Sequence, residues 1–214
     1  MKKATLKLLA IALAAFLAGC AVTPSTQDID LATSAAMKSS FQEQGDAKLD
    51  RLTPDASNRA CSDAQGAALD EKLGKAIEAA NFKTVKFPAD GKLIGSWAEG
   101  EKIAQNGRGL TWTDKAADAN GGSCYNCHQI SKTELSYGSI GPSLYNYGKL
   151  RGVTDPALDA SKPIVDYTWG KLWNSKAYNA CSGMPRFGHA NILTMEQIKD
   201  VMALLLDPKS PVNQ

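Results

Sequence analysis

The sequence lacks long apolar runs and has very little histidine. The stretch from Leu8 to Ala18 is its longest apolar run, and it falls short of the roughly 20 residues that a membrane-spanning helix needs. No useful length of the sequence alternates apolar and polar residues as a half-buried strand does, and there is no internal repeat. The histidines are His128 and His189 alone. We therefore expect a mainly α protein with few imidazole groups available for chemistry.

A strong charge of either sign is also absent. The 24 basic and 22 acidic residues give a net charge of +2. Without residues 1–20, which include Lys2, Lys3 and Lys7 and no acidic residue, 21 basic residues remain and the net charge is −1. A nearly neutral surface does not attract a polyanion over long distances. We therefore expect no nucleic acid partner.

Residues 1–20 have the composition of an export signal, with a basic start, an apolar run and small residues before a cysteine. The end of this segment, Leu17-Ala18-Gly19-Cys20, resembles the bacterial lipobox. Our interpretation is a signal peptide followed by lipidation of Cys20, which tethers a periplasmic protein to a membrane that it does not span. The alternatives are an ordinary signal peptide cleaved near Ala18 and an uncleaved anchor.

Three further segments follow the signal. Residues 21–60 are polar, which predicts a largely irregular tether with one short helix around Ile29 to Phe41. Residues 61–94 predict a helical extension, with Leu73 on the apolar face of its helix, followed by an extended connector. Residues 95–214 predict the main folded domain.

The main domain begins and ends with helix start signals. Ser96 and Glu99 match the capping-box pattern, and so do Thr194 and Gln197. In such a box, each side chain bonds to the backbone N–H of the other residue. A further helix is predicted from Val165 to Ala177. These signals indicate that the domain is built from helices joined by glycine-rich loops.

The segment Ser123-Cys124-Tyr125-Asn126-Cys127-His128 contains the pattern Cys-x-x-Cys-His. In an exported protein this pattern indicates covalent attachment of haem c, here one group per chain. The two cysteines can bond to both vinyl groups of one haem, and the histidine that follows lies under the iron. A structural zinc site needs four ligands, and the other candidates lie far away in the sequence. A thioredoxin-like dithiol needs a βαβ setting that this region lacks.

One axial ligand of the iron is therefore expected to be His128. Met184 is the expected second ligand, because it lies in an irregular loop where core packing does not explain a methionine. Pro185 favours an extended conformation at Met184, which can direct the thioether inward. A thioether opposite histidine raises the haem potential and suits electron transfer. His189 and an unpaired Cys181 remain alternative ligands.

Two cysteines remain once Cys20, Cys124 and Cys127 have been assigned. We expect Cys61 and Cys181 to form a disulfide, because export places them in an oxidising compartment. Such a bond would join the helical extension to the loop that contains Met184.

The arginines indicate a role less clearly than the cysteines and His128 do. Arg108, Arg151 and Arg186 are candidates to neutralise haem propionates, and surface ion pairs are the alternative role. The sequence does not choose among the three.

Another loop resembles part of a known fold. Ile140-Gly141-Pro142-Ser143-Leu144 is similar to the Gly-Pro loop of class I cytochromes c, in which the proline carbonyl orients the haem-ligating histidine. This resemblance implies that role for Pro142. It also implies a class I cytochrome c-like haem domain in residues 95–214, preceded by the helical N-terminal extension.

A wider resemblance covers roughly residues 95–214 and is to the SoxX family of periplasmic monohaem cytochromes c. It implies that Cys124, Cys127, His128 and Met184 are the haem residues. The lipobox and residues 21–94 depart from the shorter, soluble members of the family. The segments that carry the resemblance are GEKIAQNGRGL, SCYNCHQI, GSIGPSLYNYG, WNSKAYNACSGMPRFG and ILTMEQIKDVMALLLDPKSPVN.

The resemblance also implies partners. In that family the small cytochrome forms a heterodimer with a larger haem subunit, SoxA, and the pair oxidatively joins thiosulfate to a cysteine of the carrier protein SoxYZ. The larger subunit contains the catalytic haem, and the small one passes electrons to a downstream acceptor. The implied role is an electron-transfer subunit with no catalytic residues of its own.

The residues agree with a role in electron transfer. Both axial positions are expected to be filled, and no nucleophile arrangement or pair of carboxylates stands out. The alternatives are a membrane-tethered electron shuttle that serves a respiratory enzyme, and a haem enzyme such as a peroxidase.

Overall fold

The computed structural model describes residues 23–115 and 117–214. The chain divides into two compact units between Gln42 and Glu43. The described part of the first unit contains helix α2 (Thr26–Ser40), which buries none of its residues. This helix begins at Thr26 because Ser25 caps it: the Ser25 hydroxyl accepts a hydrogen bond from the Asp28 N–H, and Asp28 bonds back to the Ser25 N–H. The prediction of a helix around Ile29 to Phe41 is confirmed, with an earlier start.

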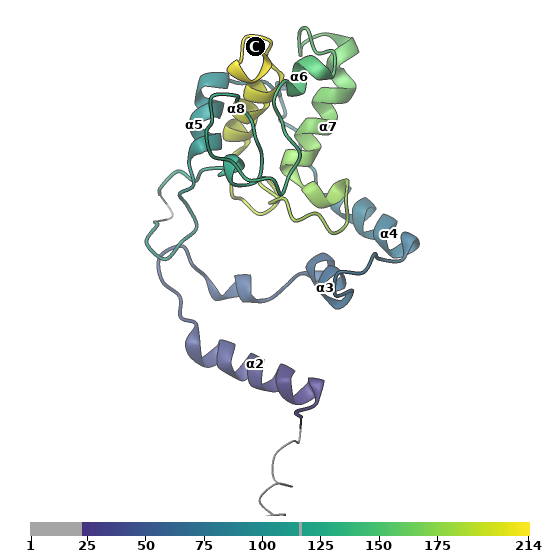
Figure 1. Cartoon of the computed structure of the whole chain (residues 1–214), viewed down its shortest axis with the longest axis vertical. Helices are drawn as coiled ribbons and strands as arrows, with labels where there is room; N and C mark the ends of the chain where they lie inside the picture. Colours follow the sequence, from purple (N-terminus) through teal and green to yellow (C-terminus); the bar gives the residue numbers. More distant parts are fainter. Residues whose placement is uncertain (1–22, 116) are drawn as a thin grey trace, which may run out of the picture. The chain divides into compact units, whose positions relative to one another are not determined.

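The second unit is helical as well (Figure 1). Within the described residues there is no strand, and the only β pairing is an isolated bridge between Gln44 and Ala47. The mainly α prediction is therefore confirmed. The α-helices of this unit are α3 (Ala56–Asp63), α4 (Glu71–Phe82), α5 (Trp97–Gln105), α6 (Tyr147–Leu150), α7 (Lys162–Trp173) and α8 (Met195–Leu206). Short 3-10 helices lie between them: η1 (Leu49–Leu52), η2 (Cys124–Asn126), η3 (Asp159–Ser161), η4 (Ser175–Ala177) and η5 (Pro211–Asn213).

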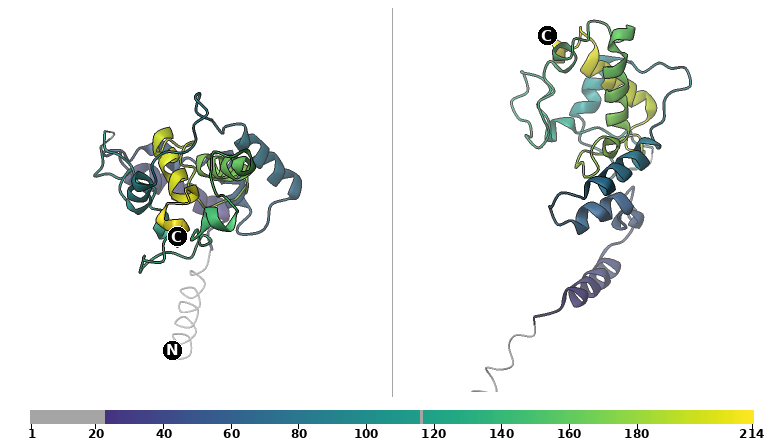
Figure 2. Two further views of the ribbon diagram at one scale, coloured as in Figure 1. Left: turned by 90° about the horizontal axis from the view of Figure 1, so that it is seen from above. Right: turned by 90° about the vertical axis from the view of Figure 1, so that its right-hand side faces the viewer.

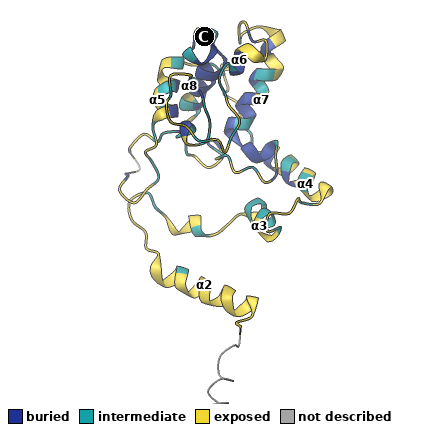
Figure 3. Ribbon diagram, viewed as in Figure 1, coloured by how far each residue is buried: buried dark blue, intermediate teal, exposed yellow. Residues whose placement is uncertain are grey.

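Helix α8 occupies the centre of this unit, with α5 and α7 on either side of it (Figures 1 and 2). Its start is the predicted capping box, since Thr194 accepts from the Gln197 N–H and Gln197 accepts from the Thr194 N–H. Its first turns carry a mixture of polar and apolar residues, but its second half is buried on every side (Figure 3). The helix ends at Leu206, with the extended Asp207 as its C-cap before Pro208, which lacks the N–H needed to continue it.

The start of α5 differs from its predicted capping box. Ser96 accepts from the Glu99 N–H, but Glu99 does not return the bond and instead pairs with Lys102 at 2.7 Å. The Ser96 N–H donates to the Asp200 carboxylate of α8 at 2.8 Å. A partner from another helix thus replaces the local one, and it ties the start of α5 to α8.

The extension in front of α5 is held by tryptophans of α7. The Trp169 indole N–H donates to the Lys86 carbonyl at 2.8 Å, and that of Trp173 donates to the Thr84 carbonyl at 3.1 Å. Buried indole groups usually need such a partner. These two bonds fix the connector after α4 along α7, so the extension packs against the main domain.

Two helix predictions need correction. The helix predicted from Val165 to Ala177 ends at Trp173 and is followed by η4, because the backbone of Asn174 is extended. In α4, Leu73 is 45% exposed, whereas Ile77 and Asn81 are buried. The buried face of α4 therefore includes an asparagine, which the apolar pattern could not reveal.

Gly100 sets how closely α5 approaches α8. A Cβ at this position would clash with the backbone carbonyl of Asp200, which cannot move without shifting α8. We expect Gly100→Ala to lower the free energy of unfolding by about 1–3 kcal/mol, the usual cost of overpacking a close contact. Urea denaturation of both proteins measures the change.

Gly74 provides the matched control within a helix. A Cβ there meets nothing within 4 Å, so Gly74→Ala should stabilise the protein by up to about 1 kcal/mol through helix propensity. Equal effects of the two substitutions would contradict the proposed close approach of α5 and α8.

Candidate cofactor site

The candidate site is a cavity of about 530 Å³ in the second unit. Its volume falls within the roughly 300–1,000 Å³ that small-molecule and cofactor sites occupy. Cys124, Cys127, His128 and Met184 all line it, although the methionine lies far along the chain from the other three. The apolar part of the lining comes from Ala104, Ile130, Leu144, Tyr147, Leu172, Phe187, Val201, Leu204 and Leu205.

A tight turn brings the two thiols to the cavity together. The carbonyl of Cys124 accepts from the N–H of Cys127 at 3.1 Å and from that of His128 at 2.9 Å. Ser123, just before η2, adopts a left-handed backbone with φ of +49°, a region that few residues other than glycine take. Neither thiol is in a disulfide. One turn therefore places both thiols and the imidazole of the Cys-x-x-Cys-His segment at the cavity.

Cys124 is partly buried and lines the cavity. Desolvation by burial raises its pKa to about 12, compared with an ordinary value of 9.0. A Cβ on the neighbouring Gly122 would come within 3.0 Å of the Cys124 sulfur, so the backbone is packed closely around it. The group is therefore a neutral thiol in the folded protein at physiological pH.

His128 is oriented by the loop that follows it. Its Nδ1 lies 2.7 Å from the Pro142 carbonyl oxygen. A carbonyl can only accept, so Nδ1 carries the proton and the lone pair of Nε2 is free to act as a ligand. The backbone of Gly141 lies against the imidazole, and a Cβ there would clash with the ring. The Gly141 N–H also donates to the Cys127 carbonyl at 2.8 Å, which joins the two loops.

Met184 enters the cavity from the loop after η4. Its carbonyl accepts from the Ser175 hydroxyl at 2.6 Å, and its N–H donates to the Ser182 hydroxyl at 3.3 Å. The side chain is partly buried and packs against the main apolar core. Ser175 was not among the sequence-based candidates, because nothing in its neighbours marks it as a support for this loop.

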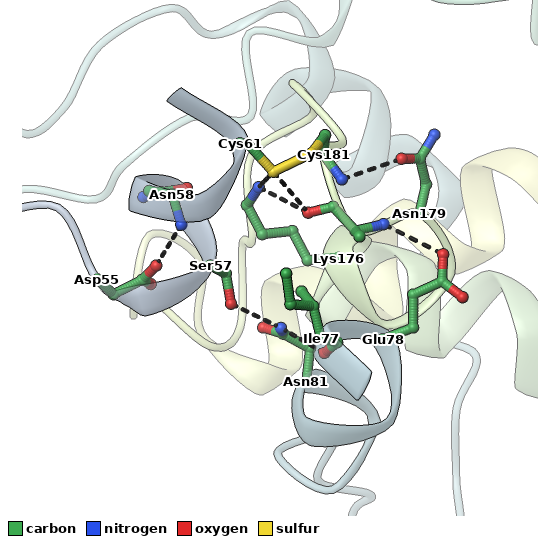
Figure 4. The surroundings of a disulfide bond; sticks show 11 residues. Asp55, Ser57, Asn58, Cys61, Ile77, Glu78, Asn81, Lys176, Asn179 and Cys181 are labelled. Atoms are coloured by element: carbon green, nitrogen blue, oxygen red, sulfur yellow. Dashed lines mark hydrogen bonds between the residues drawn. A yellow bond between two sulfur atoms is a disulfide. The ribbon is translucent and has the colours of Figure 1, made fainter. Parts of the chain in front are cut away.

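The alternative ligands do not have the same placement. Cys181 also lines the cavity, but its sulfur is bonded to Cys61 across a sequence separation of 120 (Figure 4). The predicted disulfide is therefore present. His189 is exposed and is not part of the cavity lining.

The structure separates the three candidate arginines. Arg151 lines the cavity, with its guanidinium 3.8 Å from the centre of the Tyr147 ring. Arg186 is paired with Asp55 at 2.6 Å, and Arg108 lies at a different, smaller hollow. Lys171, which was not a candidate, contributes a second cation to the lining. Its position on α7 gave no signal, since an isolated lysine on a helix is usually a surface residue.

The donor set suits a covalently attached haem. The cavity offers two thiols on one turn, an imidazole with an available Nε2 and a thioether from a distant loop, and these are the groups that hold haem c in electron-transfer proteins. Across the described ranges 23–115 and 117–214, no three His, Cys, Asp or Glu side chains are grouped as a metal ion would need.

No protein-family model matches the sequence. A protein of Aquifex aeolicus (strain VF5) is 36% identical to it over 132 residues, which are 61% of this chain and 59% of that protein. That protein is named an uncharacterized lipoprotein. The matched region is thus less than two thirds of the relative's length.

In the part of the chain that the structure describes, no helix is both long enough and apolar enough to cross a bilayer. Cys20 and the rest of the predicted signal lie outside the described residues.

The raised pKa of Cys124 predicts low reactivity. In protein made without haem attachment, we expect iodoacetamide at pH 8 to alkylate Cys124 about a thousandfold more slowly in the folded chain than in urea, because only the thiolate reacts and burial suppresses it. Peptide mapping by mass spectrometry measures the rate. Equal rates in both states would show that the thiol is not buried as described.

Proposed function

We propose that the cavity holds one haem c, bonded to Cys124 and Cys127, with His128 and Met184 as axial ligands of the iron. The observation that carries this proposal is that all four residues line one cavity although Met184 is distant in the sequence. The contact between His128 Nδ1 and the Pro142 carbonyl supports it, because it leaves Nε2 free for the iron. When bound, the haem supplies a one-electron couple of its iron.

The chain's own residues would orient the histidine ligand and set the polarity and charge around the haem. The Pro142 carbonyl keeps the proton on Nδ1 and fixes the plane of the imidazole. Apolar side chains of α8, among them Val201, Leu204 and Leu205, line the cavity and would exclude water around a bound haem. Arg151 supplies positive charge at the cavity wall, where acidic groups of a cofactor would lie. With both axial positions taken, the chain would transfer electrons and not bind a substrate at the metal.

We further propose that the chain is the electron-accepting subunit of a thiosulfate-oxidising complex, as the resemblance to SoxX suggests. The loop of residues 130–142 supports a stable partner. Ile140 lines the cavity and is 87% exposed, while Leu135 and Tyr137 of the same loop are also exposed. Apolar side chains left exposed together mark interaction surfaces. A free shuttle, in contrast, would be expected to surround its haem edge with charge.

The test is purification of the tagged protein from thiosulfate-grown cells, followed by a haem-stained gel. The expected result is a haem band at the size of this chain and an equal amount of a larger haem protein. A single haem band at the size of this chain would favour a lone electron shuttle and remove the thiosulfate assignment. A preparation without covalent haem would overturn the whole proposal.

Met184→Ala tests the axial ligand. The oxidised protein should show the weak long-wavelength band of sulfur-to-iron charge transfer, and the variant should lose it and have a lower reduction potential, because a soft thioether stabilises ferrous iron. His189→Ala is the control and should keep the band. Absence of the band from the wild-type protein, or its persistence in Met184→Ala, would exclude Met184 as the ligand.

We also propose that Cys20 is lipidated and anchors the protein to a membrane on its periplasmic side. The lipobox-like segment and the lipoprotein name of the relative from Aquifex aeolicus support this. Cys20→Ser should move the protein from the membrane fraction to the soluble periplasmic fraction, since the acyl chains supply the membrane affinity. Wild-type protein that remains in the soluble fraction would contradict the anchor.

A further inference from the structure

We propose that the N-terminal extension positions Met184 by clamping the loop around it on both sides. The brace is residues 55–82, which contain α3 and α4, and the ligand loop is residues 178–188. The inference rests on the proposed function, because it concerns how the iron ligand is held. Cys61, Asp55 and Glu78 of the brace are thereby assigned as positioning residues for Met184.

The first clamp lies just before Met184 and is covalent. Cys61 of α3 is bonded to Cys181, three positions ahead of the methionine (Figure 4). Glu78 of α4 accepts a hydrogen bond from the Ala180 N–H at 3.2 Å. Lys176 donates to the Ala180 carbonyl at 3.0 Å. The backbone at residues 180 and 181 is therefore held from both α3 and α4.

The second clamp lies just after Met184 and is electrostatic. Arg186 pairs with Asp55 at 2.6 Å, and the arginine side chain is only 16% exposed, so solvent screens this pair less than an open surface pair. Asp55 is itself fixed, because its other interaction caps α3 through the Asn58 N–H at 2.8 Å. The two clamps hold the chain on either side of Met184.

A buried polar network links the brace to the support beneath Met184. The Asn174 side-chain amide donates to the Asn81 oxygen at 3.0 Å and to the Thr84 hydroxyl at 2.9 Å. Asn81 in turn donates to Ser57 of α3 at 3.0 Å. The residue after Asn174 is Ser175, whose hydroxyl donates to the Met184 carbonyl. The brace is therefore also connected to the Met184 backbone through Asn174 and Ser175.

The ligand loop needs this outside support, because it contains no helix or strand of its own. Segments of this kind open locally more easily than the helices beside them. An opening would withdraw the thioether from the cavity and leave an axial position free for another ligand. The clamps restrict this motion without supplying a ligand to the proposed haem iron.

The decisive variant is the double substitution of Cys61→Ala and Cys181→Ala in the full-length, haem-loaded protein. We expect cyanide to bind the ferric protein at least about tenfold faster, since binding requires Met184 to leave and the loop now opens more often. The sulfur-to-iron band should weaken. Hydrogen exchange should rise in residues 178–188 and remain slow in α8.

Two further variants separate positioning from general stability. Asp55→Asn keeps the cap acceptor of α3 but removes the charge that faces Arg186, so it should speed cyanide binding to a smaller extent. Ile198→Ala removes buried side-chain atoms from α8, and Ile198 does not line the cavity. It should lower the urea midpoint and leave the band and the exchange of residues 178–188 unchanged.

The outcomes distinguish this inference from the proposed function. Wild-type protein without covalent haem would overturn the proposed function, and hydrogen exchange of residues 178–188 in the same variants would still decide whether the clamps hold the loop. Haem-loaded variants that match the wild type in cyanide binding, spectrum and exchange would overturn the inference alone. Equal acceleration in Ile198→Ala would also overturn it, because the effect would then be global.

Discussion

The burial of α8 is the constraint from which the rest of the second unit follows. Helices α5, α6 and α7 all pack against it, and three of its side chains form the floor of the cavity. The second half of α8 is apolar on every side, and such a segment is stable only when other elements cover it. The close approach of α5 at Gly100 and the hydrogen bond from Ser96 to Asp200 are direct consequences of that packing.

The cavity that results is asymmetric. One wall is a short turn that presents Cys124, Cys127 and His128 together, and its backbone hydrogen bonds are formed within the turn and with neighbouring loops. The other wall is an irregular loop that is held by residues far from it in the sequence. In the proposed haem site, the histidine side is thus held by its own turn and by the Pro142 loop of the main domain, while the methionine side depends on the extension.

This dependence gives the extension a structural role that its composition does not suggest. Residues 55–82 contribute few large apolar side chains to the core. They contribute instead a disulfide, an ion pair and a network of buried amide groups. Such directional contacts fix position more than they add hydrophobic stability, which suits a part that holds a loop in place.

Much of the local structure followed from the sequence by itself. The capping box of α8, the end of that helix before Pro208 and the turn of the Cys-x-x-Cys-His segment were predictable, because each depends on hydrogen bonds between near neighbours. Counting cysteines also identified the pair Cys61 and Cys181, since the other three had stronger assignments. Tertiary structure decided the remainder. The Ser96 N–H at the start of α5 bonds to Asp200 and not to Glu99. Arg186 pairs with Asp55, and Asn81 is buried in α4. These contacts join residues far apart in the chain, and only the packing around α8 determines which polar groups meet.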